Sequence, residues 1–328
     1  MNKIELENLI EKSGIKIKSP RIIKGIGDDA AVIKINDDLV AIKTIDVFTP
    51  IIDDPIIQGK LTACNVTSDI YAMGAVDILG VLVFLAIDSK MPLKISSDLL
   101  KGFQEFCEKE KTTIIGGQTI QNPWPLIGGE ATGICKIDNV IYSTGVKLND
   151  ILVLTKPLGI QPIMAAYRIV RDDNNEFMDY VYEIIDKKEL RASEKLAIES
   201  MTKSNKPVAE VFQKVPVHAA TDITGFGLIG HTEEMLVNET KIDIEITKMP
   251  IFKGALGVSE LCSYGLEEGR AAETAGGFLI SVAPDHLDNL ISELKRNNVN
   301  PHIVGKAIPG SGKVKISKKV EMHEIKVV

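Results

Sequence analysis

The chain has 328 residues, of which 45% are hydrophobic and 25% are charged, and its formal net charge is −7. This composition is typical of a soluble globular protein, and the length predicts two domains. The negative charge argues against the broad basic surface that nucleic-acid binding needs.

The sequence contains no feature of a membrane or secreted protein. The longest apolar run, Ile78 to Ile87, is too short to cross a bilayer, and the first 20 residues lack a signal-peptide pattern. The cysteines have no metal-ligand or redox spacing and are interpreted as buried thiols; they are Cys64, Cys107, Cys135 and Cys262. We therefore expect a cytoplasmic protein without a membrane or nucleic-acid partner.

After a weak helical pattern over residues 2–12, two glycines lead into two adjacent carboxylates, Asp28 and Asp29, within Gly25 to Val32. Adjacent carboxylates repel each other, and a hard divalent cation with phosphate oxygens would relieve that repulsion. Ordinary turn chemistry after glycine is the alternative. Strands over 31–35 and 39–45 are predicted to form a hairpin. This hairpin places Asp46 just past the end of its second strand.

A helix is predicted over residues 55–73, because Asp54 is a good N-cap and Pro55 suits the first helical position. Asn65 and Asp69 are four residues apart, so they project from one face of this helix. Polar side chains on so apolar a helix need a reason, and a functional role is one interpretation of Asp69. A capped or solvent-facing carboxylate is the alternative.

A buried strand is predicted over 78–87, followed by an amphipathic helix from Ser96 or Ser97. A short strand over 112–115 is expected to break at Gly116 to Thr119. Paired glycines there let backbone amides approach a phosphate, although they also mark bulges and turns. Strands over 127–137 and 150–155 complete the strand-rich first half.

Helical patterns dominate from Lys156 to about residue 213, which predicts a domain boundary near 155 and domains spanning 1–155 and 156–328. Asp222 then precedes a glycine-rich turn and a helix over 228–237, an arrangement that suits an anion. A simple N-cap is the alternative for Asp222, and His231 is interpreted as a structural histidine. Strands over 241–247, 277–282 and 302–306 alternate with a helix over 285–297.

Taken together, these stretches resemble the selenophosphate synthetases (selenide, water dikinases), of the superfamily that includes aminoimidazole ribonucleotide synthetase. The Gly-Asp-Asp-Ala-Ala-Val motif from Gly27 is shared across that superfamily. Three stretches are more specific: Thr44 to Pro50, Asn65 to Gly74, and Thr221 to His231. The resemblance runs in order from Gly25 to Gly305.

The resemblance implies an α/β (α+β) fold of two domains, in which an N-terminal mixed-sheet domain binds ATP and Mg²⁺ and forms a homodimer. It implies that Asp29, Asp69 and Asp222 hold Mg²⁺. Nucleotide contacts are implied for Ile26, Gly27, Asp28, Asp46 and Asp69, and for Gly117, Gln118 and Thr119 toward the ATP of the neighbouring subunit. The implied reaction converts ATP, selenide and water into selenophosphate, AMP and phosphate.

Two departures from the family pattern leave alternatives open. Gln118 stands where family members often have histidine, and glutamine cannot carry a proton at neutral pH. The family also carries a nucleophilic cysteine or selenocysteine, followed three residues later by lysine, upstream of where this chain begins; no cysteine here inherits that role. We favour a misassigned start at Met1, over a shortened chain or a nucleotide-binding paralogue without the nucleophile. A thiamine-monophosphate kinase-like enzyme is the other alternative.

Overall fold

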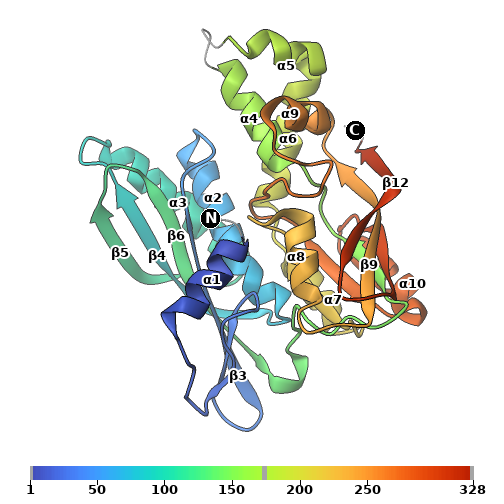
Figure 1. Cartoon of the computed structure of the whole chain (residues 1–328). Helices are drawn as coiled ribbons and strands as arrows, with labels where there is room; N and C mark the ends of the chain where they lie inside the picture. Colours follow the sequence, from blue (N-terminus) through green and yellow to red (C-terminus); the bar gives the residue numbers. More distant parts are fainter. Residues whose placement is uncertain (1–2, 172–175, 326–328) are drawn as a thin grey trace.

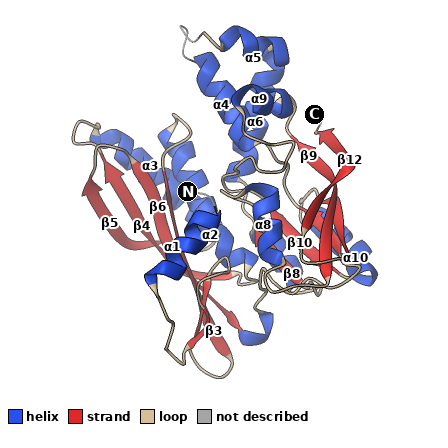
Figure 2. Cartoon of the chain, viewed as in Figure 1, coloured by secondary structure: helices blue, strands red, loops and turns tan. Residues whose placement is uncertain are grey.

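The computed structural model describes residues 3–171 and 176–325, which form two domains, each built on a six-stranded mixed sheet (Figures 1 and 2). The first sheet has the spatial order β1 (Ile22–Lys24), β2 (Ala31–Lys34), β3 (Leu39–Phe48), β6 (Leu126–Lys136), β4 (Asp77–Ile87) and β5 (Ile114–Gln121). The second has the order β12 (Val314–Glu324), β9 (Ile242–Ile251), β11 (His302–Pro309), β7 (Ile151–Leu154), β10 (Phe278–Val282) and β8 (Ala219–Asp222). The predicted two-domain α/β (α+β) fold class, with a mixed sheet in the N-terminal domain, is confirmed.

Helices cover these sheets unequally (Figure 1). In the first domain α2 (Pro55–Ala72) and α3 (Leu93–Lys109) pack on one face of the sheet, and α1 (Lys3–Ser13) precedes it. In the second domain α4 (Ile160–Arg171), α5 (Met178–Ile184), α6 (Lys187–Thr202) and α9 (Ala255–Cys262) pack together. The others are α7 (Lys206–Phe212), α8 (Gly227–Met235), α10 (Pro284–Arg296) and a short 3₁₀ turn (Ile137–Asn139).

Helix α2 is the element that joins the two domains. Its predicted start is confirmed, because the Asp54 carboxylate accepts hydrogen bonds from the backbone N–H groups of Ile56 and Ile57. The helix packs against β3 and β6 of the first sheet and against β8 and α6 of the second domain, so most of its residues are buried. Polar side chains on such a helix must find partners in the interior.

The predicted position of Asp46 was wrong. We expected the strand to end at residue 45, but β3 continues to Phe48 and Asp46 lies inside it, opposite Gly129 of β6. The cause is a long-range partner, since β6 pairs with β3 along its whole length. Asp46 is therefore held on a rigid strand and not on a loop.

The predicted break at Gly116 was also wrong, because β5 runs through both glycines and pairs in parallel with β4. Glycine is required at position 117 because β4 and β5 approach closely there: a Cβ on Gly117 would lie 1.9 Å from the Val83 carbonyl oxygen. The φ of 150° at Gly117 also disfavours other residues. Gly117, Gln118 and Thr119 consequently lie on the edge strand of the sheet.

Two other strands differ from expectation. Strand β4 was predicted to be buried, but Leu79 is 56% exposed and Leu82 is 41% exposed. Helices α2 and α3 cover one face of this sheet and leave the other open (Figure 1). Strand β7, which the division at residue 155 assigns to the first domain, lies between β11 and β10 of the second sheet. The chain therefore crosses to the second sheet before residue 151.

Candidate active site

A cavity of about 520 Å³ lies between the two domains. It is bounded by α1, the loop before β2, β3 and α2 on one side and by β8, the turn after it and α8 on the other. Its described lining consists of Leu6, Ile10, Glu11, Ile26, Gly27, Asp28, Asp29, Asp46, Asp69, Ser143, Asp222, Thr224, Phe226, His231, Glu234 and Val237.

Most of the sequence-predicted residues meet in this cavity. The loop residues Ile26 to Asp29 and the three other aspartates, at positions 46, 69 and 222, all line it. Gly117, Gln118 and Thr119 do not belong to its described lining, because they lie on the edge strand β5. Within one chain, the carboxylates therefore meet in one cavity, and the paired glycines lie outside its described lining.

A hydrogen bond between Asp29 and Thr221 links the two domains. The hydroxyl of Thr221, next to Asp222 on β8, donates a hydrogen bond of 2.7 Å to Asp29 Oδ1. The second oxygen of Asp29 is buried without a hydrogen-bond partner among the described residues, and so is Oδ2 of Asp222. Unpaired buried carboxylate oxygens are costly, which indicates that a cation belongs beside them.

Asp46 and Asp69 are oriented by polar neighbours on the adjacent elements. Asn65 Nδ2 on α2 donates a hydrogen bond of 3.0 Å to Asp46 Oδ2, and Thr44 on β3 donates its hydroxyl to Asp69 Oδ2. Asn65 Oδ1 also accepts a hydrogen bond of 2.7 Å from the Ala275 backbone N–H in the second domain. Asn65 therefore couples the position of Asp46 to the second domain.

The electrostatics of the cavity oppose full ionisation of its carboxyls. Burial, followed by the charge of Asp222, raises the pKa of Asp46 to about 7. The same two causes raise the pKa of Asp29 and of Asp69 well above their usual range. Burial raises the pKa of Asp222, although the nearby His231 opposes the shift. Four carboxyls therefore share a region that disfavours their negative charges.

The donor set fits Mg²⁺ bound together with a phosphate ligand. No lysine or arginine belongs to the described lining, and Lys24, 3.3 Å from Asp28, neutralises only that carboxylate. Within the described ranges, no three His, Cys, Asp or Glu side chains converge closely enough to enclose a metal ion by themselves. Mg²⁺ commonly takes one or two carboxylates and completes its octahedron with water and substrate phosphates. The unpaired oxygens of Asp29 and Asp222 suit that mode.

The turn that follows Asp222 is held by His231. Asp222 is the last residue of β8 and does not cap α8, whose N-cap residue is Phe226 without a side-chain cap bond. His231 Nε2 accepts a hydrogen bond of 3.1 Å from the Thr224 N–H, and its Nδ1 lies 3.0 Å from the Glu234 carboxylate. The histidine is thus structural, as expected, and it also lines the cavity.

Sequence reasoning missed several lining residues. Ser143, whose N–H donates a hydrogen bond of 2.9 Å to Asp28 Oδ1, lies in a loop without any motif. Glu234 is three residues after His231 on α8, so helical spacing could have found it. Leu6 and Ile10 of α1 lie within residues 2–12, which gave only a weak helical pattern, and nothing in that pattern pointed to the cavity.

The described cysteines do not supply a reactive thiolate here. Burial raises the pKa of Cys64 and of Cys135 to about 11 and that of Cys107 to about 12, and it also raises the pKa of Cys262. None of the four belongs to the described lining of the cavity. Reactive cysteines need the opposite shift and access to a ligand.

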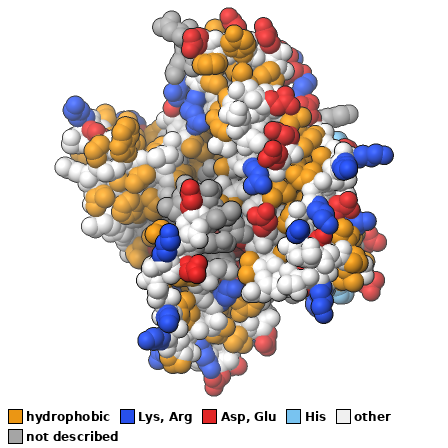
Figure 3. Space-filling model, in the orientation of Figure 1, with side chains coloured by type: hydrophobic (Ala, Val, Ile, Leu, Met, Phe, Trp, Pro, Cys, Tyr) orange, Lys and Arg blue, Asp and Glu red, His pale blue; other side chains and the backbone are white. Residues whose placement is uncertain are grey.

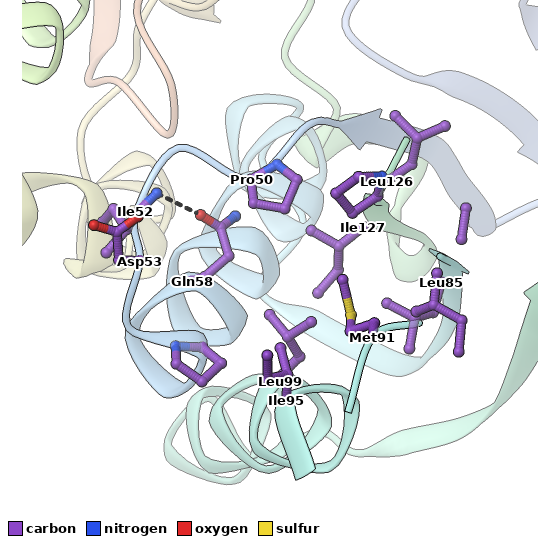
Figure 4. A pocket seen from close by; sticks show the side chains of 14 residues that line it. Pro50, Ile52, Asp53, Gln58, Leu85, Met91, Ile95, Leu99, Leu126 and Ile127 are labelled. Atoms are coloured by element: carbon purple, nitrogen blue, oxygen red, sulfur yellow. Dashed lines mark hydrogen bonds between the residues drawn. The ribbon is translucent and has the colours of Figure 1, made fainter. Parts of the chain in front are cut away.

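A second, smaller cavity of about 200 Å³ lies within the first domain, where α2 and α3 meet the ends of β4 and β6 (Figure 4). Its walls are mainly apolar, with Leu85, Leu99 and Ile127 among them. The Gln58 amide oxygen accepts a hydrogen bond of 3.1 Å from the Ile52 N–H beside it. This cavity holds none of the predicted site residues.

Comparison with known proteins identifies the family. A family model described as "AIR synthase related protein, N-terminal domain" matches residues 27–135, and its C-terminal counterpart matches residues 148–317. The selenide, water dikinase of Methanococcus maripaludis is 45% identical over 98% of this chain and 96% of its own length. The chain belongs to the selenide, water dikinase family.

Other members of the selenide, water dikinase family match nearly as much of the chain. The enzyme of Methanocaldococcus jannaschii is 46% identical over 93% of this chain and 87% of its own length. Human selenide, water dikinase 2 is 33% identical over 92% of this chain and 69% of its own length. These relatives disfavour the thiamine-monophosphate kinase alternative.

Solved structures with low sequence identity share the fold. A complex of the protein named AaThiL with AMPPCP and TMP has a TM-score of 0.71 and 18% identity, covering 96% of this chain and 93% of the other. The hydrogenase maturation protein HypE in complex with ATP has a TM-score of 0.64 and 13% identity, covering 91% of this chain and 87% of the other.

No helix within the described ranges combines the length and apolar character that a membrane crossing requires.

Proposed function

We propose that this chain is a selenide, water dikinase, which converts ATP, selenide and water into selenophosphate, AMP and phosphate in the cavity between its domains. The observation that carries the proposal is the 45% identity to the Methanococcus maripaludis enzyme over almost both full lengths. The convergence of aspartates from both domains on one cavity supports it independently.

The aspartates have separate roles in this proposal. Asp29, Asp69 and Asp222 would hold Mg²⁺ ions, with phosphate oxygens and water completing the coordination, and Asp29 and Asp222 would use their unpaired oxygens. Bound Mg²⁺ would neutralise the charge that develops on the polyphosphate during phosphoryl transfer. Asp46, fixed by Asn65, would orient the nucleotide.

The loop before β2 would contact the nucleotide through its backbone. Gly27 has a φ of 98° and no atom within 4 Å of the position of a Cβ, so the cavity is open at this point. Asp28 is fixed beside it by the N–H groups of Ser143 and Asp29, at 2.9 and 3.1 Å. Ile26, Gly27 and Asp28 can therefore offer a fixed surface to a ligand.

We also propose that the uncovered face of the first sheet forms a homodimer. Ile45, Leu79, Leu82 and Ile115 are 67%, 56%, 41% and 60% exposed on it, and hydrophobic side chains gather over this lobe, at the left of Figure 3. Exposed apolar side chains gathered on one face of a sheet mark an interaction site, even with the ion pair of Lys43 and Glu130 among them. Edge strand β5 with Gly117, Gln118 and Thr119 borders this face, so in a dimer these residues could reach the nucleotide of the neighbouring subunit.

The test is nucleotide turnover of the purified chain with Mg²⁺ and ATP, with and without selenide, under anaerobic conditions. Selenide-dependent AMP and selenophosphate support the proposal. Formation of ADP with another phosphate acceptor would identify a different kinase of the superfamily, and nucleotide binding without turnover would identify a paralogue without catalysis. A cytoplasmic location stays a prediction from the sequence.

A further inference from the structure

The proposed reaction raises a problem of selectivity, because two acceptors compete for the first phosphoryl group. Selenide must take one phosphoryl group, forming a P–Se bond while the P–O bond to the departing nucleotide breaks. Water takes the other, which leaves AMP and phosphate. If water took both groups, the products would be AMP and two phosphates. The enzyme therefore needs to keep water away from the first transfer.

The cavity lining combines acidic and apolar side chains. The aspartates at positions 29, 46, 69 and 222 belong to it, together with Glu11 and Glu234. The apolar members are Leu6 and Ile10 of α1, Ile26, Phe226 and Val237. A polyphosphate held by the aspartates would thus share the cavity with apolar side chains, which offer no hydrogen bonds to hold water.

Helix α1 supplies two of these apolar side chains. Leu6 and Ile10 are one helical turn apart, so they project from the same side of α1, and both line the cavity. Leu6 is 37% exposed, whereas Leu9 on the same helix is 53% exposed and does not belong to the described lining. The helix therefore contributes Leu6, Ile10 and Glu11 to the cavity lining, and Leu9 lies outside it.

An isolated helix of 11 residues is marginal in water, so the position of α1 depends on its contacts with the rest of the fold, those of Leu6 and Ile10 at the cavity among them. Placing Leu6 and Ile10 over an acidic cavity has no evident benefit for folding alone, since carboxylates prefer a wet environment. Their position is better explained by an effect on the chemistry.

We propose that Leu6 and Ile10 are specificity-determining residues that exclude water from the first phosphoryl transfer, so that selenide is the acceptor. The inference rests on the proposed function. Polar side chains at these positions would admit water beside the phosphate. ATP cleavage would then proceed without forming the P–Se bond.

The test compares the double variant Leu6→Ser/Ile10→Ser with Leu9→Ser, which makes the same chemical change on the solvent side of α1. Selenophosphate is measured by phosphorus NMR and AMP by chromatography. We expect about one selenophosphate per AMP for the unaltered chain and for Leu9→Ser. For the double variant we expect that ratio to fall below about one half, with a several-fold rise in selenide-independent AMP.

A second variant, Leu6→Ala/Ile10→Ala, keeps high helix propensity and removes most of the apolar cover. An unchanged ratio in both double variants, or equal uncoupling in Leu9→Ser, overturns the inference. Loss of all AMP formation in both also overturns it, because a cover that only excludes water is not needed for phosphoryl transfer. Absence of selenide-dependent AMP in the unaltered chain counts instead against the proposed function.

Discussion

Asp29 and Asp222 come from different domains, yet they line one cavity and each keeps a buried carboxylate oxygen without a hydrogen-bond donor among the described residues. The charge of Asp222 is, after burial, the largest cause of the raised pKa of Asp29. Two such groups repel each other unless a cation lies between them. The repulsion between these carboxylates therefore destabilises the metal-free protein, and a bound cation would relieve it.

The first prediction concerns this repulsion. Asp222→Asn should raise the thermal stability of the metal-free chain, by about 1 kcal/mol, because it removes a buried negative charge that has unfavourable neighbours. It should also remove the stabilisation that Mg²⁺ gives the unaltered chain. Calorimetry with and without Mg²⁺ measures both effects. The exposed Asp179 of α5 provides the control Asp179→Asn, which should leave the Mg²⁺ response intact.

The second prediction concerns pH and Glu273, whose carboxylate accepts hydrogen bonds of 2.7 and 2.9 Å from the Gly159 and Ile160 N–H groups. Burial raises its pKa to about 8, so the folded chain holds a proton that the unfolded chain releases above a pKa near 4.5. Stability therefore falls as pH rises between these values, by up to about 1.4 kcal/mol per pH unit from this group.

Glu273→Gln should flatten that pH dependence, as measured by urea unfolding at pH 5, 6 and 7. The exposed Glu199 on α6 supplies the control Glu199→Gln, which should retain the slope of the unaltered chain. An identical slope in Glu273→Gln would show that the buried carboxyl is ionised across this range. In that case the two backbone hydrogen bonds lower the pKa of Glu273 by more than burial raises it.

The third prediction concerns association. Leu82→Asp places a charge on the uncovered face of the first sheet and should convert a dimer into monomers, which light scattering after gel filtration would detect. Leu93, 81% exposed at the start of α3, provides the control Leu93→Asp, which should stay dimeric. A dimer that persists in Leu82→Asp would place the interface elsewhere.

The fourth prediction concerns the strand pair β4 and β5. Gly117→Ala should lower the free energy of unfolding by about 2 kcal/mol, because its Cβ would lie 1.9 Å from the Val83 carbonyl oxygen. Gly225→Ala is the matched control, since no atom lies within 4 Å of its Cβ position. Equal denaturant midpoints for the two variants would contradict the close approach of the strands.

Local sequence signals were sufficient where the structure depends on neighbours along the chain. Asp54 and Pro55 define the start of α2 because capping involves only adjacent residues. The turn between β2 and β3 was visible for the same reason, and those strands pair as expected. The aspartates that meet in the cavity were all singled out, because a carboxylate in an apolar context stands out in a sequence.

The errors arose where distant segments decide the structure. Asp46 lies inside β3 because β6 extends the ladder beyond the predicted end, and Gly117 continues β5 because β4 approaches it closely. Strand β7 joined the other sheet through β10 and β11. Nothing near Leu6 indicated the cavity, since its only signal was helical spacing.

The most direct test is Mg²⁺-dependent binding of a non-hydrolysable ATP analogue, measured by isothermal titration calorimetry on the unaltered chain, Asp29→Asn, Asp222→Asn and the double variant. If both aspartates hold the same metal, each single variant should lose at least about tenfold in affinity. The double variant should then bind little worse than either, because coupled groups are not additive. Unaltered affinity in Asp222→Asn, or additive losses in the double variant, would contradict the shared site.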